Sequence, residues 1–298
     1  MSSGDLFAGF PPEEPFLGND PGRRIFVGTS GYSFADWVGP FYPAGTKPAD
    51  FLSFYSRHFD TVEVNSTYYR VPAPRAIEQM ERKTPPGFRF MVKVNQAMTH
   101  ERSLERSLVR AFRAALEPLK AAGKYDGLLA QFPWGFRRNV ENETHLAALR
   151  ESLAGEPLFV EFRHASWALP DMPERLRGRG LGFCAVDEPA LAGLMPPVAW
   201  VTAEDAYVRF HGRNAANWWG SRSAAAPVAA AHGPVVAGGD RYDYDYRADE
   251  LEEWVEKVRE LAGQARRTYL FFNTCHAGHA AHSAKLMREL LRQQELPA

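Results

Sequence analysis

The sequence predicts a single (β/α)8 TIM barrel, in which eight parallel strands alternate with helices. First, eight strand-like segments recur along the chain, and most are followed by a loop and a segment with helical periodicity. Second, polar residues recur at nearly every strand end, as they do where barrel strands reach an active site. Third, no G-x-G-x-x-G follows the first strand, which disfavours a doubly wound open sheet.

The composition is that of a well-packed globular protein. The 298 residues are 45% hydrophobic, which is enough for a sizeable core. The formal net charge of -1 provides no overall basic field for nucleic acid or anionic lipid. Two cysteines, Cys184 and Cys275, are too few for a disulfide framework, and Cys184 is expected to be a small core residue. Without a signal pattern or a long apolar run, a cytoplasmic protein with no membrane partner is expected.

The chain begins with a segment that differs in composition from the rest. Residues 1–23 are rich in Gly, Pro and acidic residues, which predicts a flexible tail before one barrel domain over residues 24–298. A short strand is expected at Ile25–Val27. Gly28–Tyr32 is expected to be a loop whose glycines let the backbone approach a ligand. An aromatic loop and a helix over 48–58 follow.

The stretch Thr61–Tyr69 begins as a strand that has apolar residues on one face and polar residues on the other. Val62 and Val64 share one face, and Glu63 and Asn65 share the other, because side chains alternate along a strand. A carboxylate and an amide inside a protein need partners, since burying them unpaired is unfavourable. We therefore expect other strand ends to supply those partners.

The remaining elements follow in the same alternation. Strands are expected at 88–95, 128–133, 158–163, 181–187, 206–211 and 269–273. Helices are expected at 104–122, 141–153, 172–179, 249–262 and 280–294. A long loop, residues 212–247, follows the seventh strand.

Polar residues at the strand ends form the candidate site, because these ends converge at one mouth of a barrel. The polar candidates are Ser30, Glu63, Asn65, Lys93, Asn95, Gln131, Glu161, Arg163, Asp187, Arg209, His211, Arg213 and Asn273. Aromatic and histidine side chains after the strand ends are further candidates for ligand binding. They are Tyr32, Trp37, Tyr68, His100, Trp167, Trp218 and Trp219.

The candidate site combines more cations than carboxylates. The cations are Lys93, Arg163, Arg209 and Arg213, and the carboxylates are Glu63, Glu161 and Asp187. This excess of donors favours a small anionic or sugar-like ligand. The alternative is a purely structural network, in which Glu63 pairs with Lys93 and Glu161 pairs with Arg209.

A divalent metal is a competing interpretation. Glu161, Asp187 and His211 end successive strands and are ligand types for such ions. The nearby arginines disfavour a metal, because they repel a cation and neutralise its ligands. The sequence therefore requires no metal or other cofactor.

These motifs resemble the YecE-like family, domain of unknown function 72, over roughly residues 25–292. The resemblance rests on Gly28–Tyr32 with Trp37, Val62–Tyr69, Lys93 with Thr99-His100, Gln131–Pro133, Glu161–His164 with Ser166-Trp167, Val186–Pro189, Tyr207–Arg213 and Phe272-Asn273. It implies a TIM barrel, in agreement with the strand count. It implies no specific reaction, because the family's activity is not established and the description sugar-isomerase-related is an analogy. One departure is Thr274, where the family often has a second Asn.

The leading functional interpretation is an enzyme that acts on a small anionic or sugar-like metabolite by isomerase, lyase or hydrolase chemistry. Arg163, Arg209 and Arg213 are expected to hold the anionic group. One alternative is a nucleic-acid or damaged-nucleotide binding or processing protein, which the near-neutral charge disfavours. Another is a non-catalytic protein that binds the metabolite unchanged.

The expected acid–base groups come from the same strand ends. Glu63 or Glu161 is expected to act as the general base, and His211 or Lys93 as the acid. In a variant of this hypothesis, Lys93 is a Schiff-base nucleophile, because burial or neighbouring cations activate a lysine amine.

Overall fold

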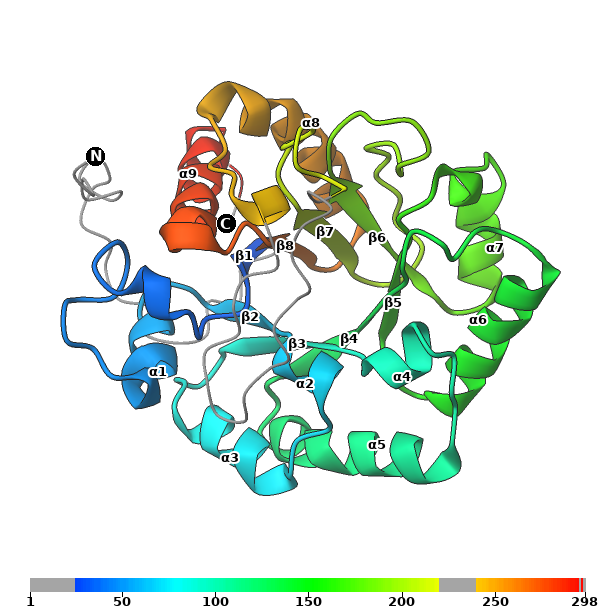
Figure 1. Ribbon diagram of the computed structural model, residues 1–298, viewed down its shortest axis with the longest axis horizontal. Coiled ribbons are helices and arrows are strands. Elements are labelled where there is room, and N and C mark those ends of the chain that lie inside the picture. The colour runs from blue at the N-terminus through cyan, green and yellow to red at the C-terminus, as the bar shows by residue number, and fades with distance from the viewer. Residues whose placement is uncertain (1–24, 220–239, 295, 297–298) are drawn as a thin grey trace.

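The computed structural model describes residues 25–219, 240–294 and 296, and it confirms the predicted barrel. Eight parallel strands close in chain order, with the last strand paired to the first. Helices surround the strands (Figure 1). The expected N-terminal tail and residues 220–239 of the long loop lie outside the described residues. Within the described part, no helix is long and apolar enough to cross a membrane.

The strands agree closely with those expected, with two differences. They are β1 (Ile25–Ser30), β2 (Thr61–Val64), β3 (Arg89–Lys93), β4 (Tyr125–Gln131), β5 (Leu158–Glu161), β6 (Gly182–Asp187), β7 (Ala206–Phe210) and β8 (Thr268–Phe272). The expected loop at Gly28–Ser30 is strand, because Thr29 pairs with both β2 and β8. β3 ends before Asn95, whose side chain caps the next helix by accepting a hydrogen bond from the backbone of Ala97.

The helices form the outer layer of the barrel. They are α1 (Phe51–Tyr55), α2 (Ser66–Tyr69), α3 (Pro74–Arg82), α4 (Gln96–Thr99), α5 (Arg106–Ala121), α6 (Val140–Ser152), α7 (Met172–Gly178), α8 (Ala248–Gln264) and α9 (His279–Gln293). α3, a short helix in which Ile77 is the one buried residue, was not predicted from the sequence. α9, the last helix, packs against β1, the first strand, so the beginning and the end of the barrel sequence lie side by side (Figure 1).

The barrel interior changes from apolar to polar along the strands. A cluster of side chains that are each at most 7% exposed occupies the part nearer the amino ends: Phe26, Met91, Leu129, Phe159, Cys184, Tyr207, Tyr269 and Phe271. Five polar residues each lie two positions after a member of this apolar cluster, so their side chains point to the same face. They are Lys93, Gln131, Glu161, Arg209 and Asn273. The apolar cluster therefore closes the barrel beneath the polar residues. Cys184 is buried within it, as predicted.

Trp37 and Trp167 are core residues, so their assignment to the mouth was wrong. The indole of Trp37 is fully buried and donates a 2.7 Å hydrogen bond to the carbonyl of Cys275. The Trp167 indole donates at 2.7 Å to the carbonyl of Phe136 and stacks on Phe162. Each tryptophan ends a short 3₁₀ turn after a strand. Position after a strand does not determine where a side chain points once the backbone has turned.

β1 and β2 pack so closely at Gly28 that adding one methyl group there is expected to destabilise the protein. A Cβ atom on Gly28 would lie 2.4 Å from the backbone carbonyl oxygen of Thr61, which cannot move aside without disturbing β2. We expect Gly28→Ala to lower the free energy of unfolding by roughly 1–3 kcal/mol. Urea unfolding followed by circular dichroism measures this change.

Gly263→Ala is the matched control. Gly263 lies in α8 with no atom within 4 Å of an added Cβ. Alanine there reduces the freedom of the unfolded chain and is expected to raise stability by up to about 1 kcal/mol. Equal effects of the two substitutions would contradict the proposed clash.

Candidate active site

One cavity of about 420 Å³ lies at the carboxyl ends of the strands. Its lining includes many of the residues predicted from the sequence: Ser30, Tyr32, Asn65, Tyr68, Lys93, His100, Gln131, Arg163, Trp218, Trp219 and Asn273. It also includes Ser66, Tyr69, Trp134, Arg241, Tyr242 and Cys275, which had not been assigned to it. Among the described lining residues there is no carboxylate, so the cavity presents cationic, amide, hydroxyl and aromatic groups.

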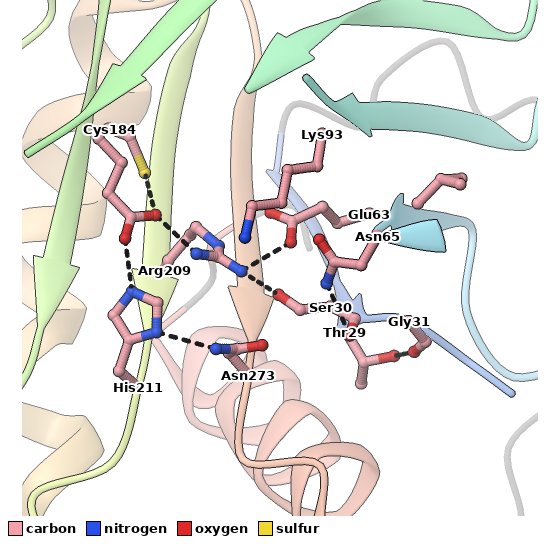
Figure 2. Close-up of polar contacts among 12 residues, drawn as sticks. Thr29, Ser30, Gly31, Glu63, Asn65, Lys93, Cys184, Arg209, His211 and Asn273 are labelled. Atoms are coloured by element: carbon pink, nitrogen blue, oxygen red, sulfur yellow. Dashed lines mark hydrogen bonds and ion pairs between the residues drawn. The ribbon is translucent and has the colours of Figure 1, made fainter. Parts of the chain in front are cut away.

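Arg209 is buried between two carboxylates next to this cavity. Its Nη1 donates to Oε2 of Glu161 at 2.6 Å, and its Nη2 donates to Oε1 of Glu63 at 2.8 Å. Nη2 also lies 3.3 Å from the hydroxyl of Ser30, as Figure 2 shows. The pairing of Glu161 with Arg209 is as predicted. Glu63 pairs with Arg209 instead of with Lys93, so that part of the predicted network was wrong.

The second oxygen of each carboxylate is also bonded. The Tyr207 hydroxyl donates to Oε2 of Glu63 at 2.6 Å, and Nε of Arg163 donates to Oε1 of Glu161 at 2.5 Å. Burial alone raises the pKa of Glu161, but attraction from Arg209 and Arg163 holds it well below its usual range. Both glutamates are therefore engaged by the protein and do not line the cavity.

Arg163 extends the network to the cavity wall. Its Nη1 donates to Glu188 at 3.2 Å, and burial, opposed by Arg163, raises the pKa of Glu188 to about 7. Burial and the Arg163 charge lower the pKa of His211 well below its ordinary value, so the imidazole is neutral. Nε2 of His211 lies 3.2 Å from Glu161, and Nδ1 lies 3.1 Å from the amide nitrogen of Asn273. The tautomer that satisfies both neighbours donates from Nε2 and accepts at Nδ1.

Lys93 lines the cavity without forming an ion pair to any described carboxylate. Figure 2 shows its side chain directed toward Glu63 and Arg209, and its Nζ lies 4.3 Å from the centre of the Tyr68 ring. Burial and the charge of Arg209 lower the pKa of Lys93 from 10.5 to about 7. Burial and Lys93 in turn lower the pKa of His100 to about 4. At neutral pH the cavity therefore contains a partly deprotonated amine and a neutral imidazole.

Aromatic side chains form the rim of the cavity. The rings of Trp134 and Trp219 lie 5.3 Å apart, and Trp219 is 58% exposed. The Arg241 guanidinium lies 4.5 Å from the ring centre of Tyr242 and 6.0 Å from that of Trp218. Such faces pack well against the apolar face of a sugar ring or another planar group.

Asp187 and Arg213 lie outside the cavity, so their assignment to the site was wrong. The Asp187 carboxylate accepts hydrogen bonds from Tyr246 and from Trp254 of α8, both at 2.6 Å, and from Arg213 at 2.7 Å. Cys184 faces the barrel interior, and Asp187 follows three residues later on the opposite face of β6. Asp187 therefore fastens α8 to the barrel.

The same alternation excludes the metal-ligand set considered from the sequence. Asp187 faces outward, whereas Glu161 and His211 face inward. In the part of the chain that the structure describes, no group of three His, Cys, Asp or Glu side chains is arranged to hold a metal ion. Asn95 is also outside the cavity, because its amide donates to the carbonyl of Thr67 at 2.9 Å.

Some site residues had a signal in the sequence and others did not. Tyr207 precedes Arg209 by two residues on the same strand face, so alternation could have identified it. Trp134, Tyr242 and Glu188 lie in loops after strands. The direction of their side chains depends on loop paths that no periodicity indicates.

Comparison with known proteins finds relatives along nearly the whole chain. Residues 26–298 match the family model described as Protein of unknown function DUF72. The chain is 32% identical to the UPF0759 protein YunF of Bacillus subtilis over 279 residues, which cover 90% of this chain and 94% of that protein. It is 25% identical to the UPF0759 protein YecE of Escherichia coli O157:H7 over 276 residues, with coverage of 90% and 93%.

A solved structure supports the same relationship. The crystal structure of a DUF72 family protein from Thermotoga maritima superposes with a TM-score of 0.78 at 40% sequence identity. The superposition covers 90% of this chain and 99% of that one.

The buried network predicts a large loss of stability when its central cation is removed. Arg209→Gln leaves Glu63 and Glu161 buried without their shared guanidinium, which is expected to lower the free energy of unfolding by roughly 3–5 kcal/mol. The matched control is Arg82→Gln, because Arg82 pairs with Glu78 where the two side chains are 71% and 43% exposed. Its expected effect is below about 1 kcal/mol. Similar losses for both variants in urea unfolding would contradict this account.

The lowered pKa of Lys93 predicts how stability depends on pH. Between about pH 7 and its ordinary pKa of 10.5, the unfolded chain binds the Lys93 proton and the folded chain does not. Stability therefore rises with pH in this window, and the penalty for the buried ammonium is full below it. Lys93→Met removes the penalty, so the variant is expected to unfold at a higher temperature near about pH 6.

The stabilisation by Lys93→Met is expected to shrink by up to about 1.4 kcal/mol for each pH unit above 7. Thermal unfolding at several pH values measures it, with Lys47→Met as control because Lys47 is exposed. A gain that does not change with pH would show that the ammonium carries no penalty in the folded protein.

Proposed function

The chain belongs to the DUF72 family, and we propose that it is an enzyme that catalyses proton transfer on a small anionic, sugar-like metabolite. The chemistry is of the isomerase, epimerase or lyase type. The observation that carries this proposal is the Lys93 amine, which has a pKa of about 7 and faces the same cavity as Arg163. A group with its pKa near the working pH is well suited to give and take protons.

The charge of the lining supports an anionic ligand. Lys93, Arg163 and Arg241 line the cavity, and no described carboxylate does. Arg163 donates one hydrogen bond each to Glu161 and Glu188, and its Nη2 lies 3.4 Å from Nδ1 of His211. The guanidinium has five N–H groups, so some are left for a ligand oxygen. A carboxylate or phosphate oxygen is the natural acceptor for such a group.

The uncharged polar groups support a ligand rich in hydroxyls. The amides of Asn65, Gln131 and Asn273 and the hydroxyl groups of Ser30 and Ser66 line the same cavity. Amides and hydroxyls both donate and accept, as sugar hydroxyls do. The aromatic rim, formed by Trp134, Trp218, Trp219 and Tyr242, offers flat faces for a ring.

The acid–base roles expected from the sequence change in this proposal. Glu63 and Glu161 are held by Arg209 and its neighbours, so we assign them to positioning rather than to the general base. The neutral amine of Lys93 serves as the base that removes a carbon-bound proton. His100, whose neutral imidazole lines the same cavity, is the group that we assign to relay a proton.

Hydrogen exchange tests this function even while the substrate is unidentified. Wild-type protein is incubated in D₂O with triose, pentose and hexose phosphates, with sugar acids, and with the corresponding neutral sugars. We expect deuterium to enter a carbon-bound position of at least one anionic compound, as measured by mass spectrometry. Lys93→Met is expected to slow this exchange by about 100-fold or more, because acid–base groups contribute that much.

Two controls accompany the exchange experiment. Lys47→Met changes an exposed lysine and is expected to leave the rate unaltered. Arg163→Gln is expected to raise KM for anionic compounds. Exchange that persists in Lys93→Met, or that prefers neutral sugars, would contradict the proposal.

A further inference from the structure

The surroundings of Lys93 suit a nucleophile as well as a base. Glu63 accepts from Tyr207 and Arg209, and Glu161 accepts from Arg209 and Arg163. Neither carboxylate forms an ion pair with the Lys93 ammonium. The amine lies against the face of Tyr68 and opens onto the cavity. A lysine held in this way keeps its nitrogen lone pair available and its direction restricted.

We propose that Lys93 forms a Schiff base with the carbonyl carbon of its substrate, which makes the substrate an aldehyde or ketone that also carries a carboxylate or phosphate group. This inference rests on the proposed function and narrows its substrate class. The anionic group is recognised by Arg163, which reaches the wall of the same cavity.

The reaction balances without any oxidant or metal ion. The nitrogen lone pair of the neutral amine forms a bond to the carbonyl carbon, and the carbonyl oxygen takes the proton that the nitrogen gives up. The carbon–oxygen bond of this carbinolamine then breaks, and the oxygen leaves with a second proton as water. The product is a protonated imine, formed from one amine, one carbonyl and one net proton.

The imine gives a more specific route to the proton transfer in the proposed function, in which Lys93 holds the substrate covalently and a neighbouring group replaces its amine as the base. Its positive nitrogen withdraws electrons through the imine carbon, so a proton on the carbon next to the imine carbon is lost more easily. Neutral His100 lines the cavity with Lys93, and its ring packs at 5.2 Å against Tyr68. Lys93 and His100 thus both contact Tyr68 at this cavity, and His100 is the imidazole that we assign as the base. Water that enters the cavity releases the product and restores the amine.

The environment of the amine keeps it reactive near neutral pH. The charged groups that act on it are Arg209, Glu161, Glu63 and Arg163, from in or just after β7, β5 and β2. Tyr68 of α2 lies against the amine, and His100, the residue after α4, packs against Tyr68. Burial and Arg209 lower the pKa of Lys93 to about 7, so a large fraction is neutral without further activation.

Borohydride trapping tests the Schiff base on the full-length protein. Pyruvate and dihydroxyacetone phosphate are the two anionic probes, and methyl pyruvate and dihydroxyacetone are their neutral counterparts. Each is incubated with the protein, reduced with sodium borohydride, and located by peptide mass spectrometry. We expect about one reduced adduct per chain, on Lys93, with one anionic probe ahead of its neutral counterpart. The probe that reacts distinguishes a carboxylate substrate from a phosphate substrate.

Variants sharpen the assignment. Lys93→Arg is expected to abolish the adduct, and Lys47→Arg is expected to leave it unchanged. Arg163→Gln is expected to slow trapping of the anionic probe by about tenfold or more while sparing the neutral one, since a hydrogen bond to a charged group is lost. Circular dichroism and thermal unfolding establish that each variant is folded.

Wild-type protein alone suffices to overturn the inference. Adducts spread over exposed lysines such as Lys47, with none enriched at Lys93, would do so. Hydrogen exchange that proceeds unchanged after borohydride treatment with its own substrate would also overturn it, yet would leave the proposed function standing. If neither hydrogen exchange nor a trapped adduct is detected, both the proposed proton-transfer function and the Schiff base at Lys93 are wrong.

Discussion

The buried guanidinium of Arg209 is the interaction on which the architecture of this site depends. An arginine that is 1% exposed between two glutamates that are fully buried carries a large desolvation penalty for all three groups. The arrangement is tolerated because Arg209 bridges both carboxylates, and Tyr207 and Arg163 bond their other oxygens. Charged groups from β2, β5 and β7 are thereby locked together inside the barrel.

This buried ion-pair network determines which side chains line the cavity. Because the glutamates bond to protein donors, the described lining contains cations and neutral polar groups but no carboxylate. Lys93 forms no ion pair with a carboxylate of the described residues, and burial together with the Arg209 charge lowers its pKa to about 7. The buried network and the amine of lowered pKa are therefore two parts of one arrangement. The sequence left a structural network and a ligand site as alternatives, and the structure has room for both: a paired network in the barrel interior and, next to it, the cavity that we propose as the ligand site.

Much of the fold and part of the site followed from alternation along strands. Period-two spacing placed Glu63, Lys93, Glu161 and Arg209 in the interior. The same rule, applied from Cys184, would have placed Asp187 outside, where it fastens α8. The errors at Trp37 and Trp167 have a different origin, because both lie in 3₁₀ turns where strand periodicity no longer holds. α3, a short helix that buries only Ile77, was also missed.

The sequence by itself determined the barrel, the order of its strands and the set of charged residues that face its interior, since these depend on local periodicity and on the convergence of parallel strands. Only the tertiary structure decided which charges pair. Each glutamate could have formed an ion pair with Lys93 or with an arginine. Which pair forms depends on distances between β2, β3, β5 and β7, and no single segment of the sequence encodes those distances. Arg209 lies within reach of both glutamates, and for that reason Lys93 is the amine left facing the cavity.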